Sequence, residues 1–289
     1  MAADRVPYSA GERKSCLDPL ASRIRRARKN GATVVIGLQG GQGTGKTTLS
    51  RYLVALFTGE GLRVATFSLD DFYRSLDERR QLAAEFPGNP FYALPRGMPG
   101  THRTSLLDGH LVRLKRGEAV DLPVFDKGAH DGAGEIASRA VTVRGRQDLV
   151  LFEGWCLGMP RVTAPELLEI CRRAPLPRLP RATPEDYQAV LAHLPPYLPI
   201  WKRIDLFVML RPDADRLHER WRLDQEKELI GRTGSGLREA EVRALVRHYL
   251  PFTRLCYEKI VPDVLLRIDS EHRYRAISFS RRDAGPPSE

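Results

Sequence analysis

The feature that most constrains the fold of this chain is a glycine-rich stretch that ends in lysine and threonine. It consists of Gly40, Gly41, Gln42, Gly43, Thr44, Gly45, Lys46 and Thr47, followed by Thr48. The apolar, β-branched residues 33–38 before it predict a buried strand, and the leucines after it lie at helical spacing. A strand, a Gly-x4-Gly-Lys-Thr loop and a helix in this order predict a site where backbone N–H groups surround phosphate. A glycine-rich turn that contains lysine by chance is the alternative, and the flanking strand and helix disfavour it.

The chemistry of this loop predicts a nucleoside triphosphate as its ligand. Glycines let the backbone curl around phosphate oxygens, and the following helix presents the partial positive charge of its N-terminus to them. Lys46 can reach the β- and γ-phosphates, and the Thr47 hydroxyl can bind Mg²⁺. We therefore expect ATP and Mg²⁺ as cofactors. The same loop also serves GTPases, motor proteins and DNA-linked ATPases, so the reaction must be inferred from other residues.

Strands and helices alternate along the rest of the chain. Further strands are predicted at 62–68, 148–153, 204–210 and 263–268, and amphipathic helices at 17–29, 47–57 and 103–115. This alternation predicts an α/β chain with a P-loop NTPase fold, in which helices cover both faces of a parallel sheet. We expect a single domain over residues 1–289, with disordered tails at 1–14 and 281–289. The proline-rich stretch 175–180 is interpreted as a surface excursion between sheet elements.

Carboxylates follow two of the predicted strands. Asp70 and Asp71 come just after the strand at 62–68, and Glu153 ends the strand at 148–153. Ligands bind at the carboxyl ends of parallel strands in such folds. Asp70 can therefore accept a proton from an attacking hydroxyl, and Glu153 can orient Mg²⁺. The alternatives are an aspartate pair that caps a turn and an ordinary acid at a strand end.

Basic residues gather beyond the predicted strand at 204–210. They lie on an expected helix and are Arg216, Arg220, Arg222 and Lys227. Cations on a mobile segment can close over phosphates and neutralise the charge of the transferred group. The alternative is a solvated helix whose cations pair with the acidic residues between them. We expect at least one of these cations to act as a lid over the phosphates.

Composition narrows the choice of partners and compartment. Lys and Arg total 46 against 36 Asp and Glu, a net charge of +10 that attracts anions. The basic residues are dispersed and form no recognised nucleic-acid-binding motif, which disfavours a nucleic-acid partner. The four cysteines are far apart in sequence and indicate neither a zinc site nor a disulfide framework. No apolar run has membrane-spanning length and the N-terminus lacks a signal-peptide pattern, so we expect a cytoplasmic protein without membrane contact.

Taken with these motifs, the sequence resembles the group of P-loop kinases that contains uridine kinase, pantothenate kinase and phosphoribulokinase. Within that group it resembles the D-glycerate 3-kinases and their uncharacterised relatives. The resemblance is carried by residues 40–47, 68–73, 96–102 and 153–158 and continues through 221–223 and 249–251. The first of these stretches is generic, whereas the next three together are specific to the group.

The resemblance implies a kinase in which Asp70 is the catalytic base and Asp71 its neighbour. The implied catalytic residues are Asp70, Lys46, Glu153, Arg220 and Arg222, with one of the two arginines as the lid cation. The implied metal ligands are Thr47, Glu153 and Asp70. The acceptor pocket would be lined by Asp71, Tyr73, Arg96, His102, Arg103, Asp126, Lys127 and His130. Arg103 departs from glycerate kinases, which carry an acid there, and residues 122–126 followed by His130 resemble uridine kinases.

The acceptor expected from these features is a small anionic molecule, with D-glycerate as the leading candidate. A buried carboxylate needs cationic hydrogen-bond donors, and Arg96, Lys127 and Arg103 could supply them. A nucleoside or another metabolite is the nearest alternative, because several aromatic residues could stack a base if they converge. A nucleic-acid-binding NTPase and a phosphate-binding protein without catalysis are the alternatives from other classes. The oligomeric state is not indicated by the sequence.

Overall fold

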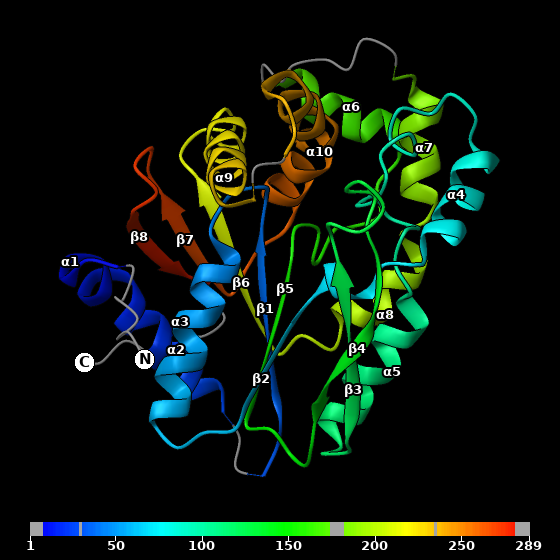
Figure 1. Cartoon of the computed structure of the whole chain (residues 1–289). Helices are drawn as coiled ribbons and strands as arrows, with labels where there is room; N and C mark the ends of the chain where they lie inside the picture. Colours follow the sequence, from blue (N-terminus) through cyan, green and yellow to red (C-terminus); the bar gives the residue numbers. More distant parts are fainter. Residues whose placement is uncertain (1–7, 29–30, 174–181, 234–235, 281–289) are drawn as a thin grey trace.

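A computed structural model of the chain describes residues 8–28, 31–173, 182–233 and 236–280. Its centre is a six-stranded sheet with the strand order β2-β5-β1-β6-β7-β8, and a separate hairpin pairs β3 with β4 (Figure 1). Five strands of the central sheet are parallel, and β8 runs antiparallel to β7 at the edge. The strands are β1 Val34–Gly40, β2 Val64–Ser68, β3 Val120–Asp126, β4 Glu135–Val143, β5 Leu149–Gly154, β6 Leu206–Pro212, β7 Val264–Ile268 and β8 Tyr274–Phe279.

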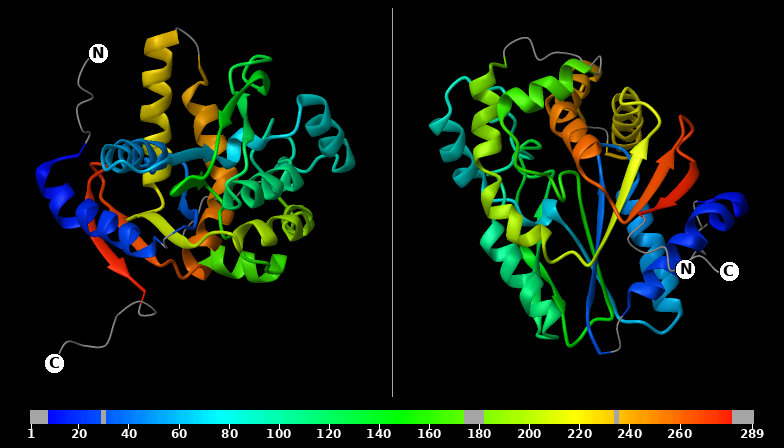
Figure 2. Two further views of the ribbon diagram at one scale, coloured as in Figure 1. Left: turned by 90° about the horizontal axis from the view of Figure 1, so that it is seen from below. Right: turned by 180° about the vertical axis from the view of Figure 1, so that it is seen from behind.

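Helices cover both faces of the central sheet. The longer helices are α2 Asp18–Ala27, α3 Lys46–Gly59, α4 Leu76–Glu85, α5 Thr104–Lys115, α6 Ala164–Arg173, α7 Pro184–Ala192, α9 Leu217–Thr233 and α10 Glu239–Lys259. The short ones are α1 Ala10–Glu12, α8 Leu198–Trp201, a π-helical turn at Arg13–Leu17 and 3-10 turns at Leu69–Phe72 and Pro195–Tyr197. Figures 1 and 2 show α2 and α3 on one side of the sheet and α5 and α8 on the other.

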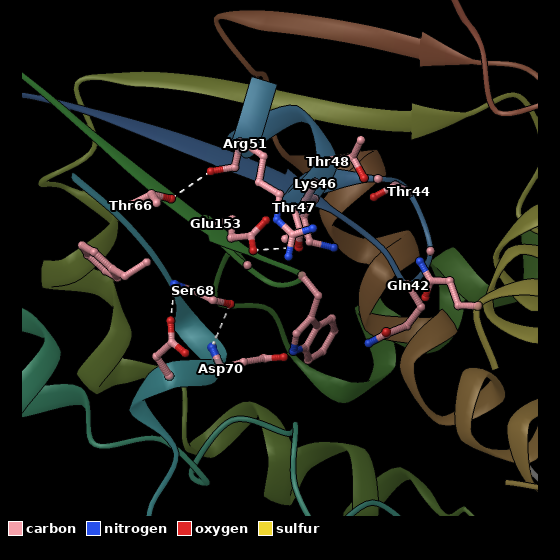
Figure 3. Close-up of a pocket in the computed structure, with 18 of the residues that line it drawn as sticks. Gln42, Thr44, Lys46, Thr47, Thr48, Arg51, Thr66, Ser68, Asp70 and Glu153 are labelled. Atoms are coloured by element: carbon pink, nitrogen blue, oxygen red, sulfur yellow. Dashed lines mark hydrogen bonds between the residues drawn. The ribbon is translucent and has the colours of Figure 1, made fainter. Parts of the chain in front are cut away.

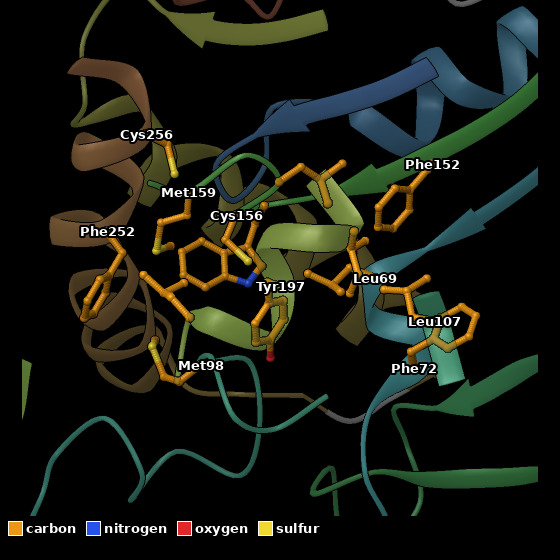
Figure 4. Close-up of a cluster of buried hydrophobic side chains, with 14 of the residues drawn as sticks. Leu69, Phe72, Met98, Leu107, Phe152, Cys156, Met159, Tyr197, Phe252 and Cys256 are labelled. Carbon is orange, nitrogen blue, oxygen red and sulfur yellow. The ribbon is translucent and has the colours of Figure 1, made fainter. Parts of the chain in front are cut away.

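The helices pack against the central sheet through two apolar cores, one on each face of the sheet. Strands β1 and β5 are buried along their whole length, as expected of central parallel strands. Successive side chains of a strand point to opposite faces, so Val35 joins one core and Ile36 the other. The first core contains the apolar faces of α5, α6, α7 and α10 (Figure 4), and the second contains those of α2 and α3.

Strand register brings the carboxyl ends of three strands to one place. Within the sheet, β1 lies between β5 and β6, and β2 pairs with the outer side of β5. Gln39 is paired with Gly154, and Ser68 with Glu153. The loop after β1, the turn after β2 and the end of β5 therefore meet at the same edge of the sheet, as the sequence predicted.

The predicted strands and helices all appear, with boundaries that differ by a few residues. The prediction of a disordered tail at 1–14 is wrong for residues 8–14, which are helical or cap a helix. They are ordered because Tyr8 packs on Tyr52 and Tyr274 and because the Tyr274 N–H donates to Glu12 at 3.0 Å. Residues 1–7, 281–289 and the proline-rich stretch 175–180 lie outside the described residues. The single-domain assignment stays a prediction.

The β3–β4 hairpin was not predicted from the sequence. Strand β4 is mostly exposed and so lacks the alternation of apolar and polar residues that marks a half-buried strand. Pro123 interrupts β3 at a shift in register. The hairpin nevertheless contributes to the site, because Lys127 follows the end of β3 directly.

Arg79 of α4 connects the hairpin to the segments around it. Arg79 is only 4% exposed, and no carboxylate of the described residues accepts from its guanidinium. The group instead donates to the carbonyls of Arg74, Pro95, Ala133 and Gly134 and lies over the Phe125 ring at 5.2 Å. One buried cation thus joins three loops that sequence places far apart.

We predict that Arg79→Met lowers the free energy of unfolding by about 3 kcal/mol or more, because several buried carbonyls lose their donors. Urea denaturation measures the change. Arg80→Met is the matched control, since the Arg80 side chain is 69% exposed beside Asp77. That neighbouring substitution should change stability by no more than about 0.5 kcal/mol. Equal effects of the two substitutions would contradict the role assigned to Arg79.

Candidate active site

The loop between β1 and α3 surrounds one end of a cavity of about 490 Å³ (Figure 3). The described residues that line the cavity are Gln42, Gly43, Thr44, Gly45, Lys46, Thr47, Thr48, Ser50, Arg51, Thr66, Phe67, Ser68, Asp70, Asp71, Lys127, Glu153, Gly154, Trp155 and Gln225. The loop turns through left-handed φ angles of 74° at Gly43 and 81° at Gly45, which non-glycine residues rarely adopt. The predicted phosphate loop and the predicted acidic residues therefore share one cavity.

Lys46 is held against its own loop. Its ammonium donates to the carbonyls of Gly40 at 2.8 Å and Gly41 at 3.0 Å. Burial lowers the pKa of Lys46, whereas the charges of Glu153 and Asp70 oppose that change. An incoming phosphate would give this buried ammonium a direct ionic partner.

The outward-facing carbonyls of the loop are bound by two histidines. His218 of α9 places its Nδ1 at 2.7 Å from the Gln42 carbonyl, and His272 of the β7–β8 turn places its Nε2 at 2.6 Å from that of Gly43. Because a carbonyl only accepts, both nitrogens must carry a proton. On the same side of the loop, the Tyr257 hydroxyl accepts from the Gly41 N–H at 2.9 Å. These contacts fix the orientation of consecutive loop peptides.

Thr47 and Glu153 form a pair suited to a magnesium ion. The Thr47 hydroxyl donates to Glu153 Oε1 at 2.8 Å (Figure 3), and Oε2 is buried without a hydrogen-bond partner among the described residues. Burial raises the pKa of Glu153, and the nearby Lys46 charge opposes that rise. Mg²⁺ takes one or two protein oxygens and completes its shell with water and phosphate oxygens, which this pair fits. Among the described residues, no group of three His, Cys, Asp or Glu side chains forms a metal cluster.

Asp70 faces the loop from the turn after β2. Tyr73 donates to its Oδ1 at 2.9 Å, and the Lys127 ammonium lies 2.5 Å from its Oδ2. Burial raises the pKa of Asp70, but the positive charge of Lys127 and the hydrogen bonds outweigh it and hold that pKa well below the ordinary value. Asp71 instead accepts from the Ser68 N–H at 2.7 Å and caps the turn. The capping alternative therefore applies to Asp71, and the role of base for Asp70 stays a prediction.

Behind Asp70 lies a wall of packed rings and one arginine. The Tyr73 ring stacks on His102 with centroids 4.5 Å apart, and His102 Nδ1 lies 2.8 Å from the Tyr197 hydroxyl. Burial lowers the pKa of His102 to about 3, so the ring is neutral at ordinary pH. The His102 Nε2 has no hydrogen-bond partner in the described part of the chain. Arg96 lies over the Phe125 ring at 5.7 Å.

The arginines expected to form a lid have different surroundings. Arg222 forms an ion pair of 2.6 Å with Glu226, whose side chain is almost fully buried, while Arg220 is exposed. Between them, Trp221 packs directly against the loop, since a Cβ on Gly43 would come within 2.7 Å of the Trp221 Cβ. Trp221 also stacks on His272 with centroids 4.1 Å apart. The helix that carries the arginines thus contacts the nucleotide loop.

Six of the eight residues expected in the acceptor pocket are not among the residues that line the cavity. Tyr73, Arg96 and His102 belong to the wall behind Asp70, and the other three lie farther out. Arg103 is exposed at the start of α5. Asp126 accepts from the Gly128 N–H at 2.9 Å within its own turn. His130 is exposed, with Nε2 4.0 Å from a Glu135 oxygen. Their positions leave Lys127 as the residue of the hairpin segment that enters the cavity.

Sequence reasoning missed several residues of the site. They are Arg51, Trp155 and Gln225 in the cavity and His218, His272 and Tyr257 behind the loop. Arg51 follows Thr47 by one helical turn, a spacing that could have placed it on the same helix face. The contacts of His218 and His272 come from distant segments and have no local pattern in the sequence.

The fold and the site define a P-loop enzyme that binds nucleoside triphosphates, and comparisons with known proteins identify its family. No protein-family model matches the chain. It is 32% identical over 234 residues to the uncharacterised kinase mug58 of Schizosaccharomyces pombe, covering 78% of this chain and 82% of that one. It is also 32% identical over 226 residues to the chloroplastic D-glycerate 3-kinase of Arabidopsis thaliana, covering 75% of this chain and 46% of that relative.

A solved structure extends the likeness to the whole fold. The D-glycerate 3-kinase of Cryptococcus neoformans superposes with a TM-score of 0.81 at 27% identity, covering 94% of this chain and all of that one. The chain belongs to the family of P-loop kinases that contains these proteins. It is an ATP-dependent phosphotransferase that acts on a hydroxyl group of a small molecule. None of its described helices is long and apolar enough to cross a membrane.

We predict that Gly43→Ala weakens nucleotide binding by about tenfold or more, because a side chain is strained at this left-handed φ and collides with Trp221. Titration calorimetry with ADP measures the affinity. Gly59→Ala is the matched control, because no atom lies within 4 Å of its added Cβ. That variant should bind ADP like the wild type. Unchanged affinity in Gly43→Ala would contradict the close packing of α9 on the loop.

Proposed function

We propose that this kinase transfers the γ-phosphoryl group of Mg·ATP to a hydroxyl of D-glycerate. The observation that carries the proposal is the meeting of Asp70, Lys127 and Lys46 in one cavity. A carboxylate that can accept a proton thus lies beside a cation that can bind an anionic acceptor, opposite the lysine of the phosphate loop. The D-glycerate 3-kinase relatives support the choice of acceptor.

Each side of the cavity has a distinct part in this reaction. The loop N–H groups and Lys46 would bind the phosphates, and Thr47 and Glu153 would hold the metal. When bound, Mg²⁺ supplies charge neutralisation for the β- and γ-phosphate oxygens. Asp70 orients the acceptor hydroxyl and takes its proton as the oxygen bonds to phosphorus. Arg222 neutralises phosphate charge when α9 closes over the nucleotide.

The surroundings of the aromatic residues favour a small anion over a nucleoside. Tyr73 stacks on His102, Phe91 packs on Tyr187, and Tyr92 stacks on Phe86. Rings that are packed on one another offer no free face to a nucleobase. Cations, by contrast, are available, because Lys127 is 57% exposed and lines the cavity.

We expect D-glycerate to be phosphorylated with a kcat/KM of at least about 10⁴ M⁻¹s⁻¹, the lower end of the range for natural substrates. ADP release from Mg·ATP measures turnover across D-glycerate, uridine, pantothenate and ribulose 5-phosphate. Preference for uridine would replace the proposed acceptor with a nucleoside. ADP release stimulated by nucleic acid without any small acceptor would favour the nucleic-acid-binding alternative.

The role of base assigned to Asp70 predicts what happens when its carboxylate is replaced. Asp70→Asn keeps the shape of the side chain but removes its basicity, so phosphoryl transfer should fall by about 10²- to 10⁴-fold while ADP binding is retained. Asp71→Asn is the matched control, because an amide oxygen can still accept from the Ser68 N–H. Steady-state kinetics with the acceptor found above should show a much smaller loss in that variant. Near-normal turnover of Asp70→Asn would remove Asp70 from the role of base.

A further inference from the structure

The two donors that bind Asp70 differ in how freely they can leave it. The Tyr73 side chain is 3% exposed and is fixed by its stack on His102. The Lys127 side chain is 57% exposed and begins just beyond the end of β3. A long lysine side chain with three rotatable donors can reorient at little cost, whereas the packed phenol cannot. Lys127 is therefore the partner of Asp70 that a ligand can draw away.

The charges around Lys127 and Asp70 determine which ligands can draw the lysine away. Lys127 contacts Asp70 within the cavity lining. Arg96 and Arg79 lie over the nearby Phe125 ring, and in the part of the chain that the structure describes no carboxylate is hydrogen-bonded to either. An acceptor with a carboxylate competes with Asp70 for the ammonium of Lys127. A neutral alcohol or a water molecule has no charge with which to compete.

We propose that Lys127 restrains Asp70 until an anionic acceptor takes its ammonium, so that one lysine both binds the acceptor and permits the reaction. This inference rests on the proposed function and deepens it, because it makes the anionic class of acceptor a condition of turnover. While Lys127 contacts Oδ2 and Tyr73 contacts Oδ1, both oxygens of Asp70 are bound. Once Lys127 has moved, Oδ2 has lost its cationic partner, and the acceptor hydroxyl can take that place and donate to it.

The reaction that follows is transfer of the γ-phosphoryl group to the acceptor hydroxyl. The acceptor oxygen forms a bond to the γ-phosphorus, the bond from that phosphorus to the bridging oxygen breaks, and ADP leaves with the bridging electrons. The hydroxyl proton passes to Asp70. Water can replace the acceptor in the same step and would hydrolyse ATP wastefully. With no anion present, the contact between Lys127 and Asp70 suppresses this side reaction.

A carboxylate ligand that lacks a hydroxyl can bind without being phosphorylated, so it tests ligand binding separately from phosphoryl transfer. Propionate matches the carbon chain and the charge of a three-carbon acceptor but cannot be phosphorylated at a hydroxyl. It should draw Lys127 away and leave room for water beside the freed Asp70. We therefore expect propionate to stimulate ATP hydrolysis by the wild-type protein, measured as phosphate release at saturating Mg·ATP.

Three variants of the full chain test the role of Lys127. Lys127→Met should raise ATP hydrolysis without acceptor by about tenfold, the equivalent of one lost charged hydrogen bond, and abolish the response to propionate. Lys127→Arg retains a cation that can pair with Asp70, so its ATP hydrolysis without acceptor should be lower than that of Lys127→Met, and part of the response to propionate should return. Lys115→Met is the matched control, because Lys115 pairs with Asp205 at 2.8 Å outside the cavity. It should behave like the wild type.

The outcomes distinguish this inference from the proposed function. A basal rate in Lys127→Met that is equal to or below the wild-type rate would overturn the restraint, as would a propionate response that survives in that variant. Failure of the wild type to phosphorylate D-glycerate would overturn only the proposed acceptor. The basal rate of Lys127→Met, which needs no acceptor, would still test the restraint. ADP affinity is measured for every variant and should stay within about twofold of the wild type if the loop is intact.

Discussion

The nucleotide site depends on the satisfaction of backbone groups that face away from the ligand. A loop that points its N–H groups at an anion must turn carbonyls in other directions, and a buried carbonyl without a donor destabilises the protein. In this kinase the carbonyls of Gln42 and Gly43 are bound by His218 and His272, while Tyr257 binds the Gly41 N–H. These partners come from α9, α10 and the β7–β8 turn. The C-terminal half of the chain therefore shapes a loop that belongs to the N-terminal half.

Charge balance imposes a second condition on the cavity. The charged side chains that line the cavity are Lys46, Arg51 and Lys127 and, opposite in sign, Asp70, Asp71 and Glu153, so positive and negative side chains are equal in number. A triphosphate adds several negative charges to this balance. Binding therefore needs cations beyond those that already offset the cavity carboxylates. On the proposed function, a metal held by Thr47 and Glu153 and the guanidinium of Arg222 would supply them. The same charge balance implies that the Asp70 carboxylate would repel the γ-phosphate unless a cation lay beside it.

The sequence predicted the nucleotide side of the site far better than the acceptor side. The strand, loop and helix around Lys46 are local in sequence, so their pattern alone places the phosphates. The positions of Asp70 and Glu153 follow from the rule that parallel strands end at one edge of a sheet. No comparable rule locates the β3–β4 hairpin, because its exposed strand β4 lacks the alternation of apolar and polar residues. Consequently the sequence could not separate Lys127, which enters the cavity, from Asp126 and His130, which do not.

Topology gives a physical reason for this difference. Strands β2 and β5 are neighbours in the sheet, yet residues 69–148 intervene between them in the chain. This insertion contains α4, α5 and the hairpin, and with them Asp70, Arg79, Arg96 and Lys127. An insertion between two paired strands can change its shape without altering the register of the sheet or the nucleotide loop. On the proposed function, acceptor choice is thus separable from phosphate binding in this fold, and Asp70, at the start of the insertion, would be the point where the two meet.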